Sequence, residues 1–231
     1  MYLRLVAAVT VEIVYLVFTR TWLRAHFSGV ELEMWVTACR LVSLCADWLL
    51  FRGFLAQAGI QRASRPTMLL WCGIALLFMV PLLFHGGYPA DYTYRVIFAL
   101  TSVVVAMREE VFYRGVIQGL LERRFGLLVS LLVSNAAFVL YHYGVHPFTA
   151  SGIIELFAMG CVLGVMYSVT GSLLAPIALH AAYDAMWSLG PIVAHPPPDI
   201  LRIPFHLLGA ALVLTWMRTQ LARARERGAP P

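Results

Sequence analysis

Long apolar segments alternate with short polar or glycine- and proline-containing breaks along most of the chain. A helix that crosses a membrane needs about 20 mainly apolar residues, and eight segments approach that length. They are residues 3–18, 34–50, 68–84, 94–121, 127–143, 153–169, 173–189 and 200–216. The pattern predicts an all-α, polytopic transmembrane helical bundle of about eight spans.

The segment 94–121 is longer than one crossing requires. As a single helix it would extend about 42 Å, against a hydrocarbon thickness of about 30 Å. It must therefore tilt, protrude or kink, and Gly115 and Gly119 are the residues at which a kink is expected.

The predicted spans divide the chain into four parts. Residues 1–93 hold about three N-terminal spans, residues 94–190 a central core of four helices, and residues 191–217 one further span. Residues 218–231 form a polar, arginine-rich tail. The first apolar segment carries Glu12 and has no cleavage site after it, so it is expected to be retained rather than removed as a signal peptide.

Composition supports the same class of protein. Hydrophobic residues make up 61% of the 231 residues and charged residues 13%, against roughly 45–50% and 25% in soluble chains. Mean hydropathy is +0.78. These values exclude a soluble cytosolic enzyme. All 17 basic residues are arginines scattered between apolar segments, so no nucleic-acid partner is expected.

The loop arginines predict an orientation, since positive residues favour the cytoplasmic side. With an inside N-terminus, ten fall inside: Arg4, Arg52, Arg62, Arg65, Arg123, Arg124, Arg218, Arg223, Arg225 and Arg227. Four fall outside: Arg20, Arg24, Arg95 and Arg202. The count predicts cytoplasmic termini. Because the chain has no lysine, which is typical of GC-rich bacterial genomes, we expect a multi-pass protein of the bacterial inner membrane.

Charged side chains inside spans are costly and usually functional, and this chain gathers several of them. The fourth span contains Arg108, Glu109, Glu110 and Arg114; the fifth ends at His142; the seventh contains His180 and Asp184. Three pairs share the i, i+4 spacing that places side chains on one helical face. These pairs are Glu110 with Arg114, Phe138 with His142, and His180 with Asp184.

Such residues suit hydrolysis of a peptide bond. A glutamate in a site of low dielectric, with a histidine opposite, can bind and deprotonate a water molecule. A second histidine can donate a hydrogen bond to the oxyanion of a tetrahedral intermediate, held by a polar partner one turn away.

Three motifs also resemble those of a known family. They are E-E-x-x-x-R at Glu109, Glu110 and Arg114, F-x-x-x-H at Phe138 and His142, and H-x-x-x-N/D at His180 and Asp184. Together they resemble the CPBP or Abi family, the CAAX-protease and bacteriocin-processing membrane proteins regarded as glutamic-type intramembrane proteases. The resemblance covers about residues 95–190.

The resemblance implies a role for each matched residue. Glu109 with His142 would activate the attacking water, His180 and Asp184 would stabilise the oxyanion, and Glu110 and Arg114 would support the site. Many relatives have asparagine where this chain has Asp184. An ionised aspartate cannot donate a hydrogen bond, so we expect Asp184 to orient His180.

Other interpretations of these residues stay open. Glu110 with Arg114, and His180 with Asp184, are also compatible with purely structural pairs between or within helices. Arg40 and Asp47, seven residues apart on one face of the second span, are expected to pair or to contact another span. A catalytic zinc ion is disfavoured because no H-E-x-x-H pair occurs, and no cofactor is expected.

The sequence thus predicts an intramembrane endopeptidase that cleaves near the membrane anchor or C-terminal region of a protein substrate. Its partners would be the lipid bilayer and a membrane-anchored or C-terminally anchored protein. The predicted topology opens the site toward the outer face, because His142 lies at the outer end of its span. Two alternatives are a non-enzymatic bacteriocin-immunity or scaffold protein and a proton-coupled transporter, although no internal symmetry supports the latter.

Overall fold

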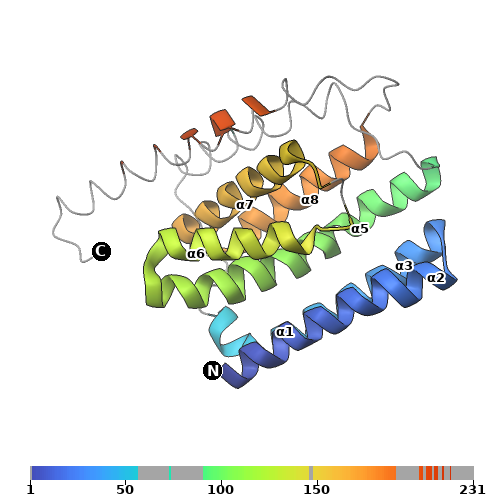
Figure 1. The fold of residues 1–231 in the computed structure, drawn as a ribbon, viewed down its shortest axis with the longest axis horizontal. Helices are drawn as coiled ribbons and strands as arrows, with labels where there is room; N and C mark the ends of the chain where they lie inside the picture. Colours follow the sequence, from blue (N-terminus) through green and yellow to red (C-terminus); the bar gives the residue numbers. More distant parts are fainter. Residues whose placement is uncertain are drawn as a thin grey trace.

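A computed structural model describes residues 2–56, 73, 91–145, 148–190 and scattered residues between 203 and 219. Its helical elements are α1 Tyr2–Val17, η1 Phe18–Leu23, α2 Arg24–His26, α3 Gly29–Leu55, α5 Tyr92–Glu110, η4 Val111–Gln118, α6 Gly119–Tyr141, α7 Ala150–Thr170 and α8 Leu174–Leu189. The elements η1 and η4 are π-helical. No strand occurs within the described ranges, and the predicted all-α class is confirmed (Figure 1).

Four helical stretches of the described chain are long and apolar enough to cross a membrane. They are Tyr2–His26, Gly29–Leu55, Tyr92–Tyr141 and Gly152–Thr170. The predicted spans 68–84 and 200–216 lie outside the described residues, except for single positions. The membrane-spanning character of the protein is thus confirmed, while the total of about eight spans stays a prediction.

The stretch Tyr92–Tyr141 contains both the fourth and the fifth predicted spans. It is interrupted at Gly126, whose φ of 79° and ψ of 174° are non-helical. Glycine adopts this backbone conformation readily because it lacks a Cβ atom. The chain reverses there, so that α6 runs back beside η4 (Figure 1).

The long fourth span is not kinked at a single glycine. Instead, Val111–Gln118 forms a π-helical segment directly after the two glutamates, and such segments are frequent at functional sites. Gly115 and Gly119 serve close packing. A Cβ atom at Gly115 would lie 2.8 Å from Cδ2 of Leu55, and one at Gly119 would lie 3.0 Å from the hydroxyl of Tyr167.

Helix α5 lies between α3 and α8, and this arrangement positions the site. Ser102, buried on α5, donates a hydrogen bond to the carbonyl of Ala181 on α8 (3.2 Å). At the start of α5, Arg95 donates to the carbonyl of Ser188 (2.6 Å) and also bonds that of Gly190. Helices α5 and α8 are therefore held together at two levels.

Two buried apolar clusters occupy the interior. One joins α6, α7 and α8 through Leu131, Ala158, Met159, Val162, Leu163, Val165, Met166 and Leu179. The other joins α1, α3, η4 and α6 through Ala8, Phe51, Leu55, Val111, Phe112, Tyr113, Val116 and Phe138. The N-terminal helices therefore pack on the central core through an apolar contact.

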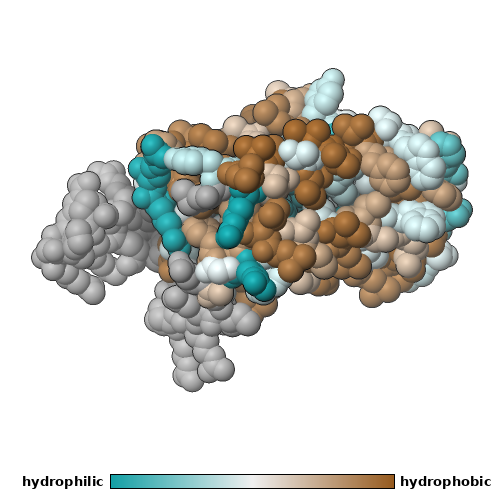
Figure 2. All heavy atoms as spheres, turned by 90° about the horizontal axis from the view of Figure 1, so that it is seen from below, coloured by the Kyte–Doolittle hydropathy of each residue, from teal (hydrophilic) through white to brown (hydrophobic). Residues whose placement is uncertain are grey.

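The outer surface is itself apolar. Leu3, Val42, Leu100, Leu128 and Leu140 are each more than 60% exposed. Figure 2 shows hydrophobic side chains over most of the middle of the visible face, with hydrophilic ones gathered toward its ends. Such a surface suits contact with lipid rather than water.

The two ends of the bundle are defined by contacts between distant segments. At one end, the hydroxyl of Tyr2 bonds Arg124 in the α6 turn, and Arg4 reaches the carbonyl of Leu50 (3.4 Å). At the opposite end, Arg20 of η1 donates to the carbonyls of Tyr141 and Tyr143, just after α6. The site lies toward this second end.

Candidate active site

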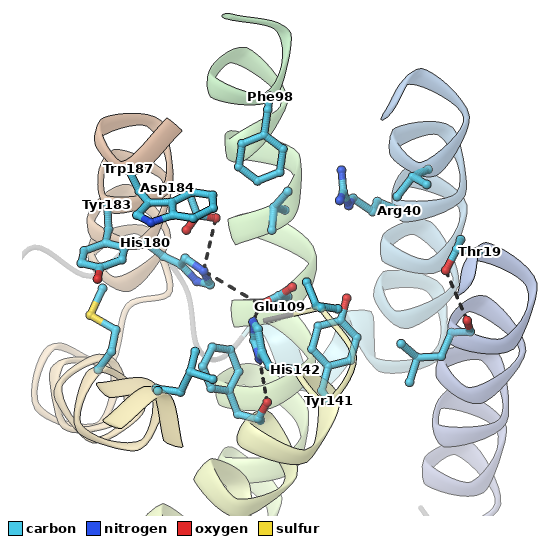
Figure 3. A pocket seen from close by; sticks show the side chains of 18 of the residues that line it. Thr19, Arg40, Phe98, Glu109, Tyr141, His142, His180, Tyr183, Asp184 and Trp187 are labelled. Carbon is cyan, nitrogen blue, oxygen red and sulfur yellow. Dashed lines mark hydrogen bonds and ion pairs between the residues drawn. The ribbon is translucent and has the colours of Figure 1, made fainter. Parts of the chain in front are cut away.

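A cavity of about 390 Å³ opens between the N-terminal helices and the central core. Its lining includes Glu109, His142, His180 and Asp184. Glu109 comes from the last turn of α5, His142 from the residue after α6, and the other two from α8. Figure 3 shows these side chains directed toward a common space. Glu109 thus shares one cavity with His180 and Asp184, which lie more than 70 positions later in the sequence.

Glu109 occupies the centre of the group and is almost completely buried. Its Oε2 atom lies 3.9 Å from Nε2 of His142 and 3.9 Å from Nε2 of His180. These separations are too long for direct hydrogen bonds. Within the described chain, Oε2 has no hydrogen-bond partner. A buried carboxylate oxygen therefore faces two imidazoles at a spacing that one water molecule can bridge.

The ring of His142 is oriented by the backbone of its own helix end. Its Nδ1 atom lies 2.8 Å from the carbonyl of Phe138. A carbonyl only accepts, so Nδ1 carries the proton, and in the neutral ring Nε2 offers a lone pair. Nε2 is the atom that faces Glu109. The helix stops here because a tight turn follows, in which Gly144 has a φ of 78°.

His180 is held by Glu110, the second glutamate of the pair. Its Nδ1 atom lies 2.7 Å from Oε1 of Glu110, a charge-assisted contact in which the imidazole donates. Its Nε2 atom lies 3.6 Å from Oδ2 of Asp184, beyond hydrogen-bonding distance. In this structure, Glu110 makes the closer contact to His180 and Asp184 lies at the opposite nitrogen.

Arg114 completes the support beneath the site. Its Nε atom lies 3.3 Å from Oε2 of Glu110, and both side chains are fully buried. The guanidinium also donates to the carbonyl of Gly160 on α7 (3.2 Å) and lies over the Phe138 ring, 4.5 Å from its centroid. A Cβ atom at Gly160 would come 3.4 Å from the same guanidinium. The E-E-x-x-x-R segment thus links α7 and α6 to the site.

Replacing Arg114 by methionine is expected to lower the free energy of unfolding by about 3 to 5 kcal/mol, because the buried Glu110 carboxylate loses its cationic partner. Thermal unfolding of the detergent-purified variant would measure the loss. Arg124→Met, at an exposed turn position, is the control and should unfold close to the wild type. Equal stability of both variants would show that Glu110 does not need this partner.

A second arginine connects the site to the N-terminal helices. Arg108, buried on α5, forms an ion pair with Glu12 of α1 and donates to the Tyr141 hydroxyl (2.8 Å). It also contacts Ser43 of α3 (3.3 Å) and lies 3.9 Å from the centroid of the Tyr15 ring. This network fixes Arg108, which directly precedes Glu109 in the chain.

The sequence motifs did not reveal this second network. Glu12 belongs to a different predicted span from its partner Arg108. Their ion pair depends on how α1 and α5, which are distant in the sequence, pack together. The available signal was a lone carboxylate inside an apolar segment, which by itself indicates a partner elsewhere in the membrane.

Arg40 and Asp47 were expected either to pair with each other or to contact another span. They do not pair with each other. Arg40 bonds Glu33 on its own helix (2.5 Å), and Glu33 also accepts from Thr101 of α5 (2.8 Å). Asp47 is buried, and within the described chain neither carboxylate oxygen has a hydrogen-bond partner. Glu33 lies seven residues before Arg40 and Asp47 lies seven residues after it. The spacing along the helix therefore did not distinguish between the two carboxylates as partners for Arg40.

The side chains of the described residues form no group of three or more histidines, cysteines and acids arranged to hold a metal ion. Cys39, Cys45 and Cys161 are free thiols.

Fold and site define the class of protein: a polytopic helical membrane protein with a buried carboxylate between two histidines. Residues 91–186 match the model of the family described as type II CAAX prenyl endopeptidase Rce1-like. The resemblance to the CAAX-protease family is thereby confirmed for this part of the chain. No curated protein and no solved structure matches the chain.

The match covers 96 residues, from 91 to 186, and contains all three motifs. It supports a CAAX-type intramembrane protease, and thus a hydrolase, in general terms. The N-terminal helices that supply Glu12, Arg20 and Arg40 lie outside the matched range.

Proposed function

We propose that the protein is a glutamic-type intramembrane endopeptidase in which Glu109 and His142 together activate a water molecule. One observation carries the proposal: the unpartnered Oε2 of Glu109 faces the imidazoles of His142 and His180 at 3.9 Å each. A water between Glu109 and His142 would donate to both. Glu109 would take its proton as the hydroxide attacks the carbonyl carbon, and would return a proton to the leaving amine.

His180 would stabilise the oxyanion that forms in this attack. Because Nδ1 donates to Glu110, a hydrogen-bond donor at Nε2 requires the imidazolium form. The adjacent Glu110 and Asp184 carboxylates favour this positive charge. In this account Glu110 orients His180, and Asp184 contributes charge rather than a hydrogen bond to the substrate.

We propose that the substrate is a membrane-anchored or C-terminally anchored protein, cleaved near its anchor. The cavity is enclosed by apolar helices whose outer surfaces suit lipid. A folded domain does not fit in about 390 Å³, so the reacting segment must enter as an extended chain.

The direct test is to supply purified protein in nanodiscs with a mixture of membrane-anchored peptides and to identify new termini by mass. We expect truncated products from the wild type and none from Glu109→Gln. A non-enzymatic immunity or scaffold protein would give no products. A transporter would move peptides or protons across a vesicle membrane without cleaving them.

We propose that the hydrolysis needs no bound metal ion. The carboxylate and imidazoles suffice for acid–base chemistry in the mechanism above, and they are spaced for a water bridge. Activity is therefore expected to be unchanged after treatment with EDTA or 1,10-phenanthroline. A loss of activity that added zinc restores would contradict this proposal, because a metal ion would then activate the attacking water.

We propose that the cavity opens on the outer face of a bacterial inner membrane, with cytoplasmic termini. Arg4, Arg52, Arg123 and Arg124 lie at the end of the bundle away from the site, where Tyr2 contacts Arg124. The predominance of arginines in loops assigned to that side supports placing it in the cytoplasm.

Single-cysteine labelling in intact cells tests this orientation, with the native cysteines replaced. Ser28 precedes α3 at the site end of the bundle, and Arg124 lies in the turn at the other end. We expect a membrane-impermeant thiol reagent to label Ser28→Cys and to leave Arg124→Cys unlabelled until the cells are opened. The reverse pattern would place the cavity mouth in the cytoplasm.

A further inference from the structure

We propose that the wall of the cavity formed by the N-terminal helices binds a carboxylate of the substrate, through Arg40 together with Arg20 and Arg24. The inference rests on the proposed proteolytic function and assigns a specificity to the same cavity. It concerns residues outside the segment that matches the protease family.

The charges that line the cavity are separated by sign. Arg20 of η1, Arg24 of α2 and Arg40 of α3 lie on the wall made by the N-terminal helices. The carboxylates Glu109, Glu155 and Asp184 line it from α5, α7 and α8. Figure 3 shows the Arg40 side chain directed from α3 into the space facing Glu109. A peptide in the cavity would therefore meet guanidinium groups on one side and the reacting carboxylate on the other.

The guanidinium wall carries more positive charge than its neighbours balance. Glu33 forms an ion pair with Arg40 but also accepts from Thr37 and Thr101. Arg20 donates to backbone carbonyls, which carry no net charge. Within the described chain, Arg24 forms no ion pair. Among the described residues, Glu33 is thus the one carboxylate paired with any of the three guanidinium groups, and the wall retains an excess of positive charge.

Two of these guanidinium groups are held in place before a ligand arrives. The Arg40 side chain is only 12% exposed and is fixed by Glu33 and Thr37. Arg20 is fixed by the carbonyls of Tyr141 and Tyr143 and lies over the Tyr141 ring, 5.4 Å from its centroid. Such preorganised groups bind anions with little loss of side-chain entropy.

Carboxylate is the anion that a peptide substrate brings into such a cavity. Guanidinium groups present a fork of N–H donors that matches a carboxylate well, and partial removal from water strengthens the pair. Because the cavity is small and also contains Glu109, the carboxylate must lie a few residues from the cleaved bond. It is either the C-terminal carboxylate of the substrate or the side chain of an aspartate or glutamate.

A binding experiment tests this without relying on cleavage. Full-length Glu109→Gln protein in phosphatidylcholine nanodiscs would be offered a mixture of synthetic peptides with one apolar anchor and randomised flanking residues. The mixture has four arms: a free C-terminal carboxylate or an amide, each with glutamate or glutamine in the randomised segment. Bound peptides are then counted by mass. Neutral lipid avoids competition from anionic headgroups.

We expect at least one carboxylate-containing arm to be enriched about tenfold over its neutral counterpart, equivalent to about 1.4 kcal/mol. Enrichment that follows the free terminus identifies the C-terminal carboxylate, and enrichment that follows glutamate identifies a side chain. Adding Arg24→Gln, at an exposed position, should reduce the enrichment. The double change Glu33→Gln with Arg40→Gln should abolish it. Arg52→Gln, also on α3 but outside the cavity lining, is the matched control and should retain it.

Binding without preference in all four arms would overturn the inference, as would a preference that survives loss of the Arg40 and Arg24 charges. Failure of the proposed function looks different. In that case the carboxylate preference is present and depends on Arg40, yet wild-type protein leaves every bound peptide intact.

Discussion

Glu109→Gln is expected to reduce kcat/KM for an anchored peptide by about 10³-fold or more. Glutamine keeps the size of the side chain but cannot accept the proton of the attacking water, and a positioned general base contributes about 10² to 10⁴ in rate. In this site the same carboxylate would also return the proton to the leaving amine, so two steps are lost together. Progress curves on the purified variant in nanodiscs, with product counted by mass, would measure the effect.

The matched control is Glu31→Gln, at an exposed position in the first turn of α3. It makes the same chemical change away from the cavity and should leave the rate unchanged. If Glu109→Gln retained more than about a tenth of the wild-type kcat/KM, a loss far smaller than general-base removal causes, then Glu109 would not be the proton acceptor.

His180→Gln is expected to lower kcat by about 10² to 10³-fold with little change in KM. A donor aimed at a developing oxyanion acts mainly in the transition state, and loss of one such donor has effects of this size. The buried Glu110 would also lose its imidazole partner, although Arg114 still neutralises it. Initial rates across a range of peptide concentrations would separate kcat from KM.

His26→Gln provides the comparison for this variant, because His26 is exposed at the end of α2. It should leave both constants unchanged. A His180→Gln variant that raised KM while keeping kcat would assign His180 to substrate binding instead of oxyanion stabilisation.

The sequence predicted the helical class and most element positions because both follow from local patterns. Segment 34–50 lies within α3, segment 153–169 within α7, and segment 173–189 matches α8 to within one residue at its start. The break between the fourth and fifth spans was placed between residues 121 and 127, and the structure reverses at Gly126. Apolar length and a glycine suffice to predict such features.

The grouping of the motif residues was also foreseeable, because costly charges inside a membrane must meet partners. The particular contacts were not. The hydrogen bond between Glu110 and His180 depends on how α5 and α8 pack face to face. The ion pair between Glu12 and Arg108 depends in the same way on how α1 and α5 pack. The π-helical segment Val111–Gln118 rotates the following residues relative to the two glutamates, and no periodic pattern indicated it.

The N-terminal helices change the picture that the motifs alone provide. The motif residues reside in the matched segment 91–186, but the cavity is completed by Tyr15, Arg20 and Arg40 from outside it. Arg108 connects the two parts through Glu12 and Ser43. The chemistry and its proposed specificity thus come from different parts of the chain, which can be altered separately.

The measurement that most directly tests the central claim is cleavage of one anchored peptide in ¹⁸O-enriched water by wild type and Glu109→Gln, side by side. We expect the wild type to yield a truncated product whose new C-terminal carboxylate carries one ¹⁸O atom from the activated water, and Glu109→Gln to leave the peptide intact. Equal amounts of the same labelled product from both proteins would contradict a mechanism in which Glu109 activates the water.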